Sequence, residues 1–336
     1  MSRYFHLIFL LIFLECVVVG SVSAHVPLST DETTGLNLVF IPEPTKSWVI
    51  YDRIEGPCDA KYYVLDLMEG EELRVSVFVT EKTILPGLIV SGPDIEKKGY
   101  IPDCLRVNYP ENAELVVLKT PEKPDYEPFT PQAIYQTGGY SKIIETPGLY
   151  YITIYGTDTK GKVGTAIGYI EKFTIYEWVM IPLLTTGIHV WEGQPIPIII
   201  LPFLITVALG FIFIGRLWAV LLPWNKFALF ASFFYMGGAA MVALQMIIAL
   251  IKTGLEISAF LTIFFISVQF LLGILLLWVG RSTKKPTYKT AAILLITGMF
   301  GFFIWAGLVI GPVISIMGGI FALYEILKPE NGDDVF

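Results

Sequence analysis

The pattern of hydrophobic and polar positions divides the chain into two regions. Between about residues 36 and 174, apolar and polar residues alternate over short stretches separated by Gly, Pro and Asp. The clearest alternation lies in KYYVLDLMEGEELRVSVFV, residues 61–79, which predicts a hairpin around MEGEE. The apolar face of its second strand holds Leu73, Val75, Val77 and Val79, and the opposite face holds Glu72, Arg74 and Ser76. Such alternation is typical of strands with one buried face.

Further strands are predicted at residues 36–41, 47–52, 87–91, 113–118, 140–144, 149–155 and 164–174. No convincing amphipathic helix separates them in the sequence. About eight or nine short strands at this spacing predict an antiparallel, jelly-roll-like β-sandwich over residues 25–175.

After Glu171 the alternation gives way to long apolar runs. Five transmembrane helices are predicted within residues 195–328, at 196–215, 227–251, 257–280, 291–310 and 312–327. A helix rises ~1.5 Å per residue, so the last run, with about 16 residues, is short for a hydrocarbon core ~30 Å thick. The chain is therefore expected to combine a β-sandwich with an α-helical membrane domain.

The segment 176–194 precedes these runs. Trp178 and Trp191 bracket it, and Pro182 and Gly187 interrupt it. Indole side chains favour the headgroup region of a bilayer, so we expect this segment to lie along the outer interface of the membrane.

The composition supports a membrane location. The 336 residues are 54% hydrophobic and 16% charged, with a mean hydropathy of +0.65, which is too apolar for an ordinary soluble protein. Residues 1–24 combine Arg3, an apolar stretch and the small residues Val22 and Ala24, which is the pattern of a signal peptide. Glu15 interrupts the apolar stretch, so an uncleaved anchor is the alternative.

Basic residues in short loops predict the orientation. The first loop between spans is flanked by Arg216 and Lys226, and the third loop carries or adjoins Arg281, Lys284, Lys285 and Lys289. Cytoplasmic loops are enriched in Lys and Arg, so both loops are predicted to be cytoplasmic. We therefore expect a multi-pass protein of the cell membrane with the sandwich outside and a short tail, residues 329–336, in the cytoplasm.

Two cysteines, Cys58 and Cys104, follow the predicted signal peptide. In an oxidising compartment an even pair predicts one disulfide, which closes a loop of about 46 residues and contributes ~3–4 kcal/mol of stability. Two buried thiols are the alternative.

Part of the sandwich resembles a known family. The residues that carry the likeness are YYVLDLMEGEELRVSVFV at 62–79, PGLIVSGPDI at 86–95 and ETPGLYYITIYGTDTKGKVGTAIGY at 145–169. Together they resemble the bacterial pre-peptidase C-terminal type of domain, over about residues 61–170. The resemblance implies a non-catalytic secreted β-sandwich that serves in binding or in the assembly of larger proteins.

An N-terminal His25 would offer an amine and an imidazole to a copper ion. Such a site needs a second imidazole, and the next histidine, His189, lies about 160 residues further on. The scarcity of histidine also argues against Ser-His-Asp and Cys-His catalysis, and no HExxH motif or pair of intramembrane aspartates occurs. We predict a protein that is not an enzyme and holds no metal or cofactor. An enzyme with an unanticipated site is the rival interpretation.

The predicted spans hold Gln245 and Gln269 but no carboxylate near their centres, which argues against an ion-coupled carrier. Glutamines at this depth are expected to hydrogen-bond between helices. Five helices exceed what is needed to anchor a sandwich, so an accessory subunit of a membrane transport or translocation complex is the alternative function.

The proline-rich loop 119–132 carries Tyr126 and Phe129, which are candidate partner-binding residues. Its prolines force an extended backbone and leave these rings available to bind. The alternative is that both rings cover an edge of their own domain.

Small residues recur every four positions in the last span, at Gly311, Ser315 and Gly319. They share a narrow helix face, which we predict docks a partner helix or a second copy of the chain, with packing inside the bundle as the alternative. Together these features predict a non-enzymatic membrane protein that displays a binding or scaffold sandwich. Its expected partners are membrane lipid and another protein or a second copy, and not nucleic acid.

Overall fold

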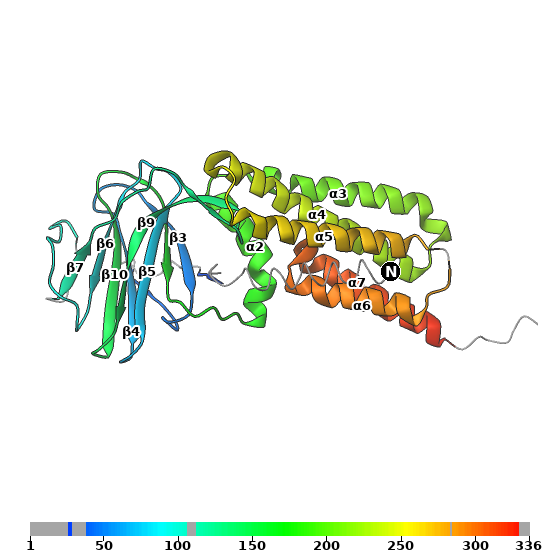
Figure 1. Ribbon diagram of the computed structural model, residues 1–336, viewed down its shortest axis with the longest axis horizontal. Helices are drawn as coiled ribbons and strands as arrows, with labels where there is room; N and C mark the ends of the chain where they lie inside the picture. Colours follow the sequence, from blue (N-terminus) through cyan, green and yellow to red (C-terminus); the bar gives the residue numbers. More distant parts are fainter. Residues whose placement is uncertain (1–25, 29–37, 106–111, 283, 329–336) are drawn as a thin grey trace, which may run out of the picture.

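A computed structural model describes residues 26–28, 38–105, 112–282 and 284–328. Strands occupy one end of the molecule and membrane helices the other (Figure 1). The predicted signal peptide, His25 and the tail 329–336 lie outside the described residues.

Two sheets form the N-terminal half. The order of strands is β1-β3-β11-β5-β9-β8 in the first sheet and β2-β4-β10-β6-β7 in the second. The strands are β1 (Val26–Pro27), β2 (Leu38–Phe40), β3 (Trp48–Ile54), β4 (Ala60–Leu67), β5 (Glu72–Val79), β6 (Pro86–Ser91), β7 (Ala113–Val116), β8 (Asp125–Glu127), β9 (Gln132–Ile143), β10 (Gly148–Gly156) and β11 (Gly161–Ile167).

The two sheets enclose a hydrophobic core. Val75 and Val77 of β5 enter it from the first sheet, and Leu65 and Ile152 enter it from the second. Arg74, between the buried Leu73 and Val75, is exposed, as the alternating pattern predicts. The predicted β-sandwich is thus confirmed.

The expectation that all strands are antiparallel is wrong at two edges. β1 pairs in parallel with β3, and Val26 lies opposite Trp48. β2 pairs in parallel with β4, and Leu38 lies opposite Tyr62. No tight hairpin joins either edge strand to its neighbour, so the turn geometry that enforces antiparallel pairing does not act on them.

The sequence pattern predicts no strand at β8 or at residues 132–139 of β9, although the structure has strands there. Gly138 has a φ of +129°, and the pairing of β9 with β5 shifts register opposite Val77 and Phe78. A bulge of this kind breaks the alternation of apolar and polar positions, which is the signal that predicts strands.

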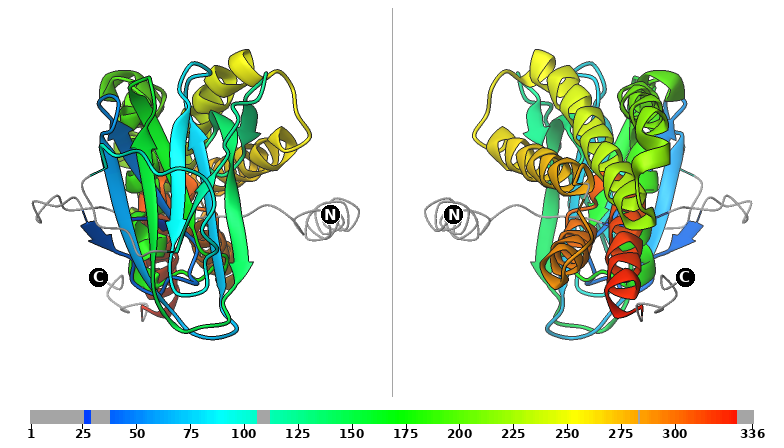
Figure 2. Two further views of the ribbon diagram at one scale, coloured as in Figure 1. Left: turned by 90° about the vertical axis from the view of Figure 1, so that its left-hand side faces the viewer. Right: turned by 90° about the vertical axis from the view of Figure 1, so that its right-hand side faces the viewer.

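The C-terminal half contains α2 (Ile175–Trp191), α3 (Ile196–Leu217), η1 (Trp218–Val220), α4 (Pro223–Thr253), α5 (Ala259–Gly280), α6 (Tyr288–Phe303), η2 (Ala306–Val309) and α7 (Ile310–Leu327). Within the described residues, four helical segments are long and apolar enough to cross a membrane, and the apolar helix α6 is shorter. α4 is central, because it contacts α3, α5 and α7, while α6 packs mainly on α7 (Figure 2). The chain is therefore a multi-pass membrane protein with a β-sheet domain.

The predicted boundary between the last two spans is wrong. α6 ends at Phe303, about seven residues earlier than expected, so α6, with 16 residues, is the short helix and not the last one. The intervening turn has positive φ at Trp305, Gly307, Leu308 and Val309. A left-handed backbone cannot continue a right-handed helix, so the apolar run is divided at this turn.

α2 runs across the ends of the membrane helices, between them and the sheets (Figure 1). Contrary to expectation, neither Pro182 nor Gly187 interrupts it, and it is one continuous helix. The contact that compensates for Pro182 lies at the junction of the two halves.

Candidate functional site

The N-terminal end of α2 is bound to the sandwich. Thr174 caps the helix, and its side chain and that of Glu177 form a capping box. Glu177 also accepts a hydrogen bond from Nζ of the buried Lys46 at 2.6 Å, and this Nζ lies 4.1 Å from the ring centroid of Trp48. Burial opposes ionisation of Glu177, but the hydrogen bonds from Lys46 and Thr174 outweigh it and lower its pKa.

The C-terminal end of α2 is bound to β3. Nε1 of Trp191 donates a hydrogen bond to the carbonyl oxygen of Asp52 at 3.0 Å. The Trp191 ring packs edge-on against Tyr51, with centroids 4.9 Å apart. The sandwich is therefore fixed to both ends of α2.

The middle of the junction joins α2 to the turn after α6. Pro182 has no N–H to donate to the carbonyl of Trp178, one helical turn earlier. Nε1 of Trp305 donates to that carbonyl instead, at 2.9 Å, while Nε1 of Trp178 donates to the carbonyl of Phe302 at 3.2 Å. The two indole rings lie 4.3 Å apart. This reciprocal pairing explains how α2 continues through Pro182.

The β8–β9 turn packs against the C-terminal end of α4 and the N-terminal end of α5. The Tyr126 hydroxyl donates to Oγ1 of Thr262 at 2.9 Å, and Thr262 donates to the carbonyl of Pro128 at 2.7 Å. The Tyr126 backbone donates to Oε2 of Glu256 at 3.1 Å and accepts from Ser258 at 3.3 Å. Four hydrogen bonds thus join this turn to the membrane half.

The prediction that Tyr126 and Phe129 form an open partner-binding surface is corrected by this contact. Tyr126 is only 4% exposed, and the ring of Phe129 lies 6.4 Å from that of Phe265 in α5. The prolines do extend the loop, but its aromatic residues pack on membrane helices. The partner residues lie more than about 120 positions further along the chain, so the loop sequence gives no sign of them.

An outer pocket of about 330 Å³ lies between the sandwich, α2 and the α4–α5 loop. Glu127 lines it, and its Oε1 accepts hydrogen bonds from the backbone N–H groups of Phe129 and Thr130 at 3.0 and 3.4 Å. Burial raises the pKa of Glu127 to about 7, against the effect of these two hydrogen bonds. None of the ion pairs among the described residues involves Glu127.

An inner cavity of about 90 Å³ lies between α2, α4, α5 and the α6–α7 turn. It adjoins the outer pocket, and both are lined by Pro128, Phe129, Ile181, Thr185 and Trp305. Most of its walls are apolar, but α4 contributes Gln245 and α5 contributes Gln269. Both amide atoms of Gln245 and Oε1 of Gln269 have no hydrogen-bond partner among the residues that the structure describes. The expectation that these glutamines hydrogen-bond between helices is therefore wrong.

The small residues of α7 face the bundle interior. Oγ of the fully buried Ser315 donates to the carbonyl of Leu294 in α6 at 2.8 Å. A Cβ added at Gly311 would lie 2.7 Å from the Tyr235 ring of α4, and one at Gly319 would lie 2.7 Å from Leu295 of α6. The predicted docking face is thus occupied by the protein's own helices, and the packing alternative is correct.

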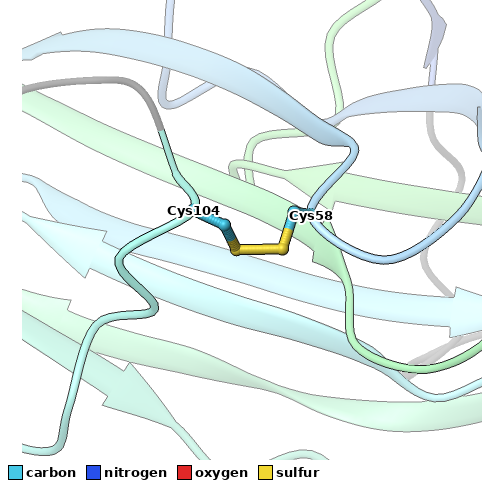
Figure 3. Close-up of a disulfide and its surroundings, with 2 residues drawn as sticks. All are labelled: Cys58 and Cys104. Atoms are coloured by element: carbon cyan, nitrogen blue, oxygen red, sulfur yellow. A yellow bond between two sulfur atoms is a disulfide. The ribbon is translucent and has the colours of Figure 1, made fainter.

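Cys58 and Cys104 form the predicted disulfide (Figure 3). Their Cα atoms are 6.0 Å apart, and 46 positions separate them in the sequence. The bond ties the turn before β4 to the long loop between β6 and β7. This prediction is confirmed.

No group of three His, Cys, Asp or Glu side chains within the described part of the chain could hold a metal ion. His189 is buried in the wall of the inner cavity, and its Nδ1 lies 2.9 Å from Oε2 of Glu192. His25, the other imidazole considered for copper, falls outside the described part.

Two features of this site are absent from the predictions: the half-buried Glu127 in the outer pocket and the presence of both glutamines in the wall of one cavity. A sequence signal exists for the second. Residues lining the cavity recur at helical spacing in both helices: Gly238, Met241, Val242 and Gln245 in α4, and Thr262, Phe265 and Gln269 in α5. No sequence signal exists for Glu127, because the other walls of its pocket come from distant segments such as α2 and β3.

No known protein family matches this chain, and no curated protein matches it either. The resemblance of residues 61–170 to the pre-peptidase C-terminal type of domain stays a prediction. The assignment of function therefore rests on the residues and contacts described above.

Proposed function

We propose that this chain is a non-enzymatic membrane protein that holds a binding or scaffold β-sandwich outside the cell in a fixed orientation. The observation that carries the proposal is the buried junction, where Tyr126 bonds to Thr262 and Lys46 bonds to Glu177. A domain that needs only an anchor can hang from a flexible linker. A sandwich held by side chains from three elements presents the same surfaces to a partner at all times.

The non-enzymatic assignment rests on the sequence, which supplies neither a triad nor a nucleophile motif. The resemblance of residues 61–170 to the pre-peptidase C-terminal type of domain supports a binding role, because it implies a non-catalytic β-sandwich. A stoichiometric metal in the purified protein would contradict this part of the proposal.

The distribution of basic residues supports an extracytoplasmic sandwich. The α3–α4 loop, flanked by Arg216 and Lys226, and the α5–α6 loop, with Arg281 and Lys284, lie at the end of the bundle away from the sheets (Figure 1). Basic loops favour the cytoplasmic side, so the sheets are assigned to the opposite side.

One end of the sandwich offers a surface for a protein partner or a second copy. Met68, Ile143 and Leu149 are 62%, 57% and 46% exposed. The register places them at one end, since Glu72 lies opposite Ile143 and Asp66 opposite Leu149. Apolar side chains gathered at one exposed place are typical of protein interaction sites.

The test uses the full-length protein purified in mild detergent, with chemical crosslinking and mass spectrometry. Changing Met68, Ile143 and Leu149 to Ser should abolish a specific crosslinked species and leave the thermal midpoint nearly unchanged, as expected for surface changes within ~0.5 kcal/mol. Val117→Ser is the matched control. Val117 is also apolar and is 80% exposed, and it follows the last residue of β7, away from the tested surface. A species that survives the triple change but not Val117→Ser would contradict this surface.

A second candidate function is an accessory subunit of a membrane transport or translocation complex. The observation that favours it is the presence of buried polar atoms without partners inside the bundle, at Gln245 and Gln269. Simple anchoring requires no such groups, and intramembrane polar residues are costly. Co-purification of a channel or carrier with a variant that lacks the sandwich would support this candidate over the first.

A further inference from the structure

The inner cavity has the geometry of a binding site within the membrane half. One face of α4 lines it from Gly238 to Gln245, and one face of α5 lines it from Thr262 to Gln269. The two helices are antiparallel, and helical side chains tilt toward the N-terminus of their own helix. Gln245 and Gln269 both line this cavity, and Oε1 of Gln269 lies 3.0 Å from where a Cβ on Gly238 would be, on the same face of α4 as Gln245.

These carboxamides are buried without partners. Gln245 is 2% exposed and Gln269 is 4% exposed, and three of their amide atoms make no hydrogen bond. A buried polar group that lacks a partner destabilises the folded protein. Two such residues lining one cavity point to an occupant that completes their hydrogen bonds.

The unpartnered atoms define the chemistry of that occupant. Oε1 of Gln245 and Oε1 of Gln269 need hydrogen-bond donors, and Nε2 of Gln245 needs an acceptor. A hydroxyl or a primary amide offers both roles, whereas a ketone or quinone offers only acceptors. No Lys or Arg among the described residues lines the cavity, so an anionic group would have no counter-charge.

We propose that this cavity binds a neutral amphiphile with a hydroxyl or amide group, drawn from the membrane. Its polar group lies between Gln245 and Gln269, and the carbon atoms next to that group lie against Met241, Phe265 and Leu308. The volume of about 90 Å³ holds a small head group, and the adjoining pocket of about 330 Å³ accommodates the remainder. This site is separate from the sandwich surface of the proposed function.

The experiment uses full-length protein in liposomes and 3-azioctanol, a photoreactive alkanol, as the probe. The expected adducts fall on peptides that contain Met241 and Phe265, and excess octanol competes with them. Changing Gln245 and Gln269 together to Met, which keeps their length, should reduce these adducts at least tenfold. Ser232→Ala is the matched control, because Ser232 is a buried, unpartnered residue of α4 outside the cavity wall. Its labelling should equal that of the unchanged protein.

Stability provides the second measurement. The two glutamines make no hydrogen bond within the described protein, so the double change to Met should leave the thermal midpoint in octanol-free detergent unchanged or higher. A lower midpoint would overturn the proposal, because it would show that the amides hold the fold together. Equal labelling of the variant, or adducts only on lipid-facing residues, would also overturn it and leave a cavity filled by water alone. Neither result depends on the Met68, Ile143 and Leu149 surface.

Discussion

At the scale of single residues, Glu127 links the junction to pH. Its carboxyl group accepts hydrogen bonds from the backbone N–H groups of Phe129 and Thr130, and the half-buried residue lines the outer pocket. In the folded protein its pKa is raised from 4.5 to about 7. The folded state therefore keeps a proton that the unfolded chain releases, and stability is lost as pH rises from about 4.5 through 7.

Glu127→Gln should remove this loss, because the amide keeps an oxygen for both N–H groups and does not ionise. The variant should match the unchanged protein at pH 4.5 and be more stable at pH 8, by up to ~3 kcal/mol at ~1.4 kcal/mol per pKa unit. Thermal midpoints across pH 4.5–8 measure the effect. The pKa of nearby Asp125 is also raised, by burial and by Glu256, so Asp125→Asn is the control that separates the two carboxyl groups. Equal midpoints at pH 8 would refute the assignment to Glu127.

Tyr126 belongs to the same contact, and its ring lies among buried residues of α4 and α5. Tyr126→Phe should cost ~0.5–1.5 kcal/mol through the lost hydrogen bond to Thr262. Tyr126→Ser should cost ~3–5 kcal/mol, because it also leaves a cavity. Tyr100→Ser, at a tyrosine that is 67% exposed, should change the thermal midpoint little. If Tyr126→Ser leaves the midpoint unchanged, the residue is not part of the junction.

At the scale of elements, α2 connects the two halves. It is bound to the sandwich through Lys46 and Asp52 and to the α6–α7 turn through Trp305. Its weak point is the carbonyl of Trp178, which Pro182 leaves without a helical donor. The indole of Trp305 satisfies this carbonyl, so the α6–α7 turn completes the hydrogen bonding of α2 at Pro182.

Trp305→Phe should therefore cost ~1–3 kcal/mol, because the Trp178 carbonyl loses its donor. Adding Pro182→Ala should recover much of this loss, since it supplies a main-chain N–H one turn after Trp178. The measurement is the thermal midpoint by circular dichroism in detergent. A double variant no more stable than Trp305→Phe alone would show that the indole acts through packing and not through this hydrogen bond.

At the scale of the whole molecule, the sandwich and the bundle are joined by buried contacts at two places, α2 and the β8–β9 turn. A covalent link between the halves also runs through residues 168–174, which precede α2. Contacts of this kind hold two domains together without the link when the interface is large and apolar.

A protease site inserted after Lys172 tests this directly. After cleavage, the sandwich should co-elute with the helical part in mild detergent. Combining Tyr126→Ser with Lys46→Ala should release it, because Glu177 then loses its partner in the sandwich and the turn loses its buried ring and its hydrogen bond to the Thr262 side chain. Release from the unchanged cleaved protein would mean that the junction is weaker than its contacts indicate.

The local pattern of the sequence determined the classes of element and one cross-link. Alternation at Leu73, Val75 and Val77 predicts a buried strand face because side chains alternate along any strand. The long apolar runs predict membrane helices for a similarly local reason, since each helix satisfies its own backbone hydrogen bonds. The pairing of Cys58 with Cys104 was predictable because no other cysteine follows residue 24.

The tertiary structure alone decided which residues meet. Tyr126 and Thr262, Pro182 and Trp305, and Gln245 and Gln269 come together through packing between distant segments. Each partner supplies a hydrogen-bonding group or a cavity wall that the local sequence around the other does not encode. The same physics buries Ser315 and half-buries Glu127, because burial depends on neighbours and not on residue type. The candidate site consists almost entirely of such contacts, and for this reason the sequence predicted the two halves of the molecule but not the junction between them.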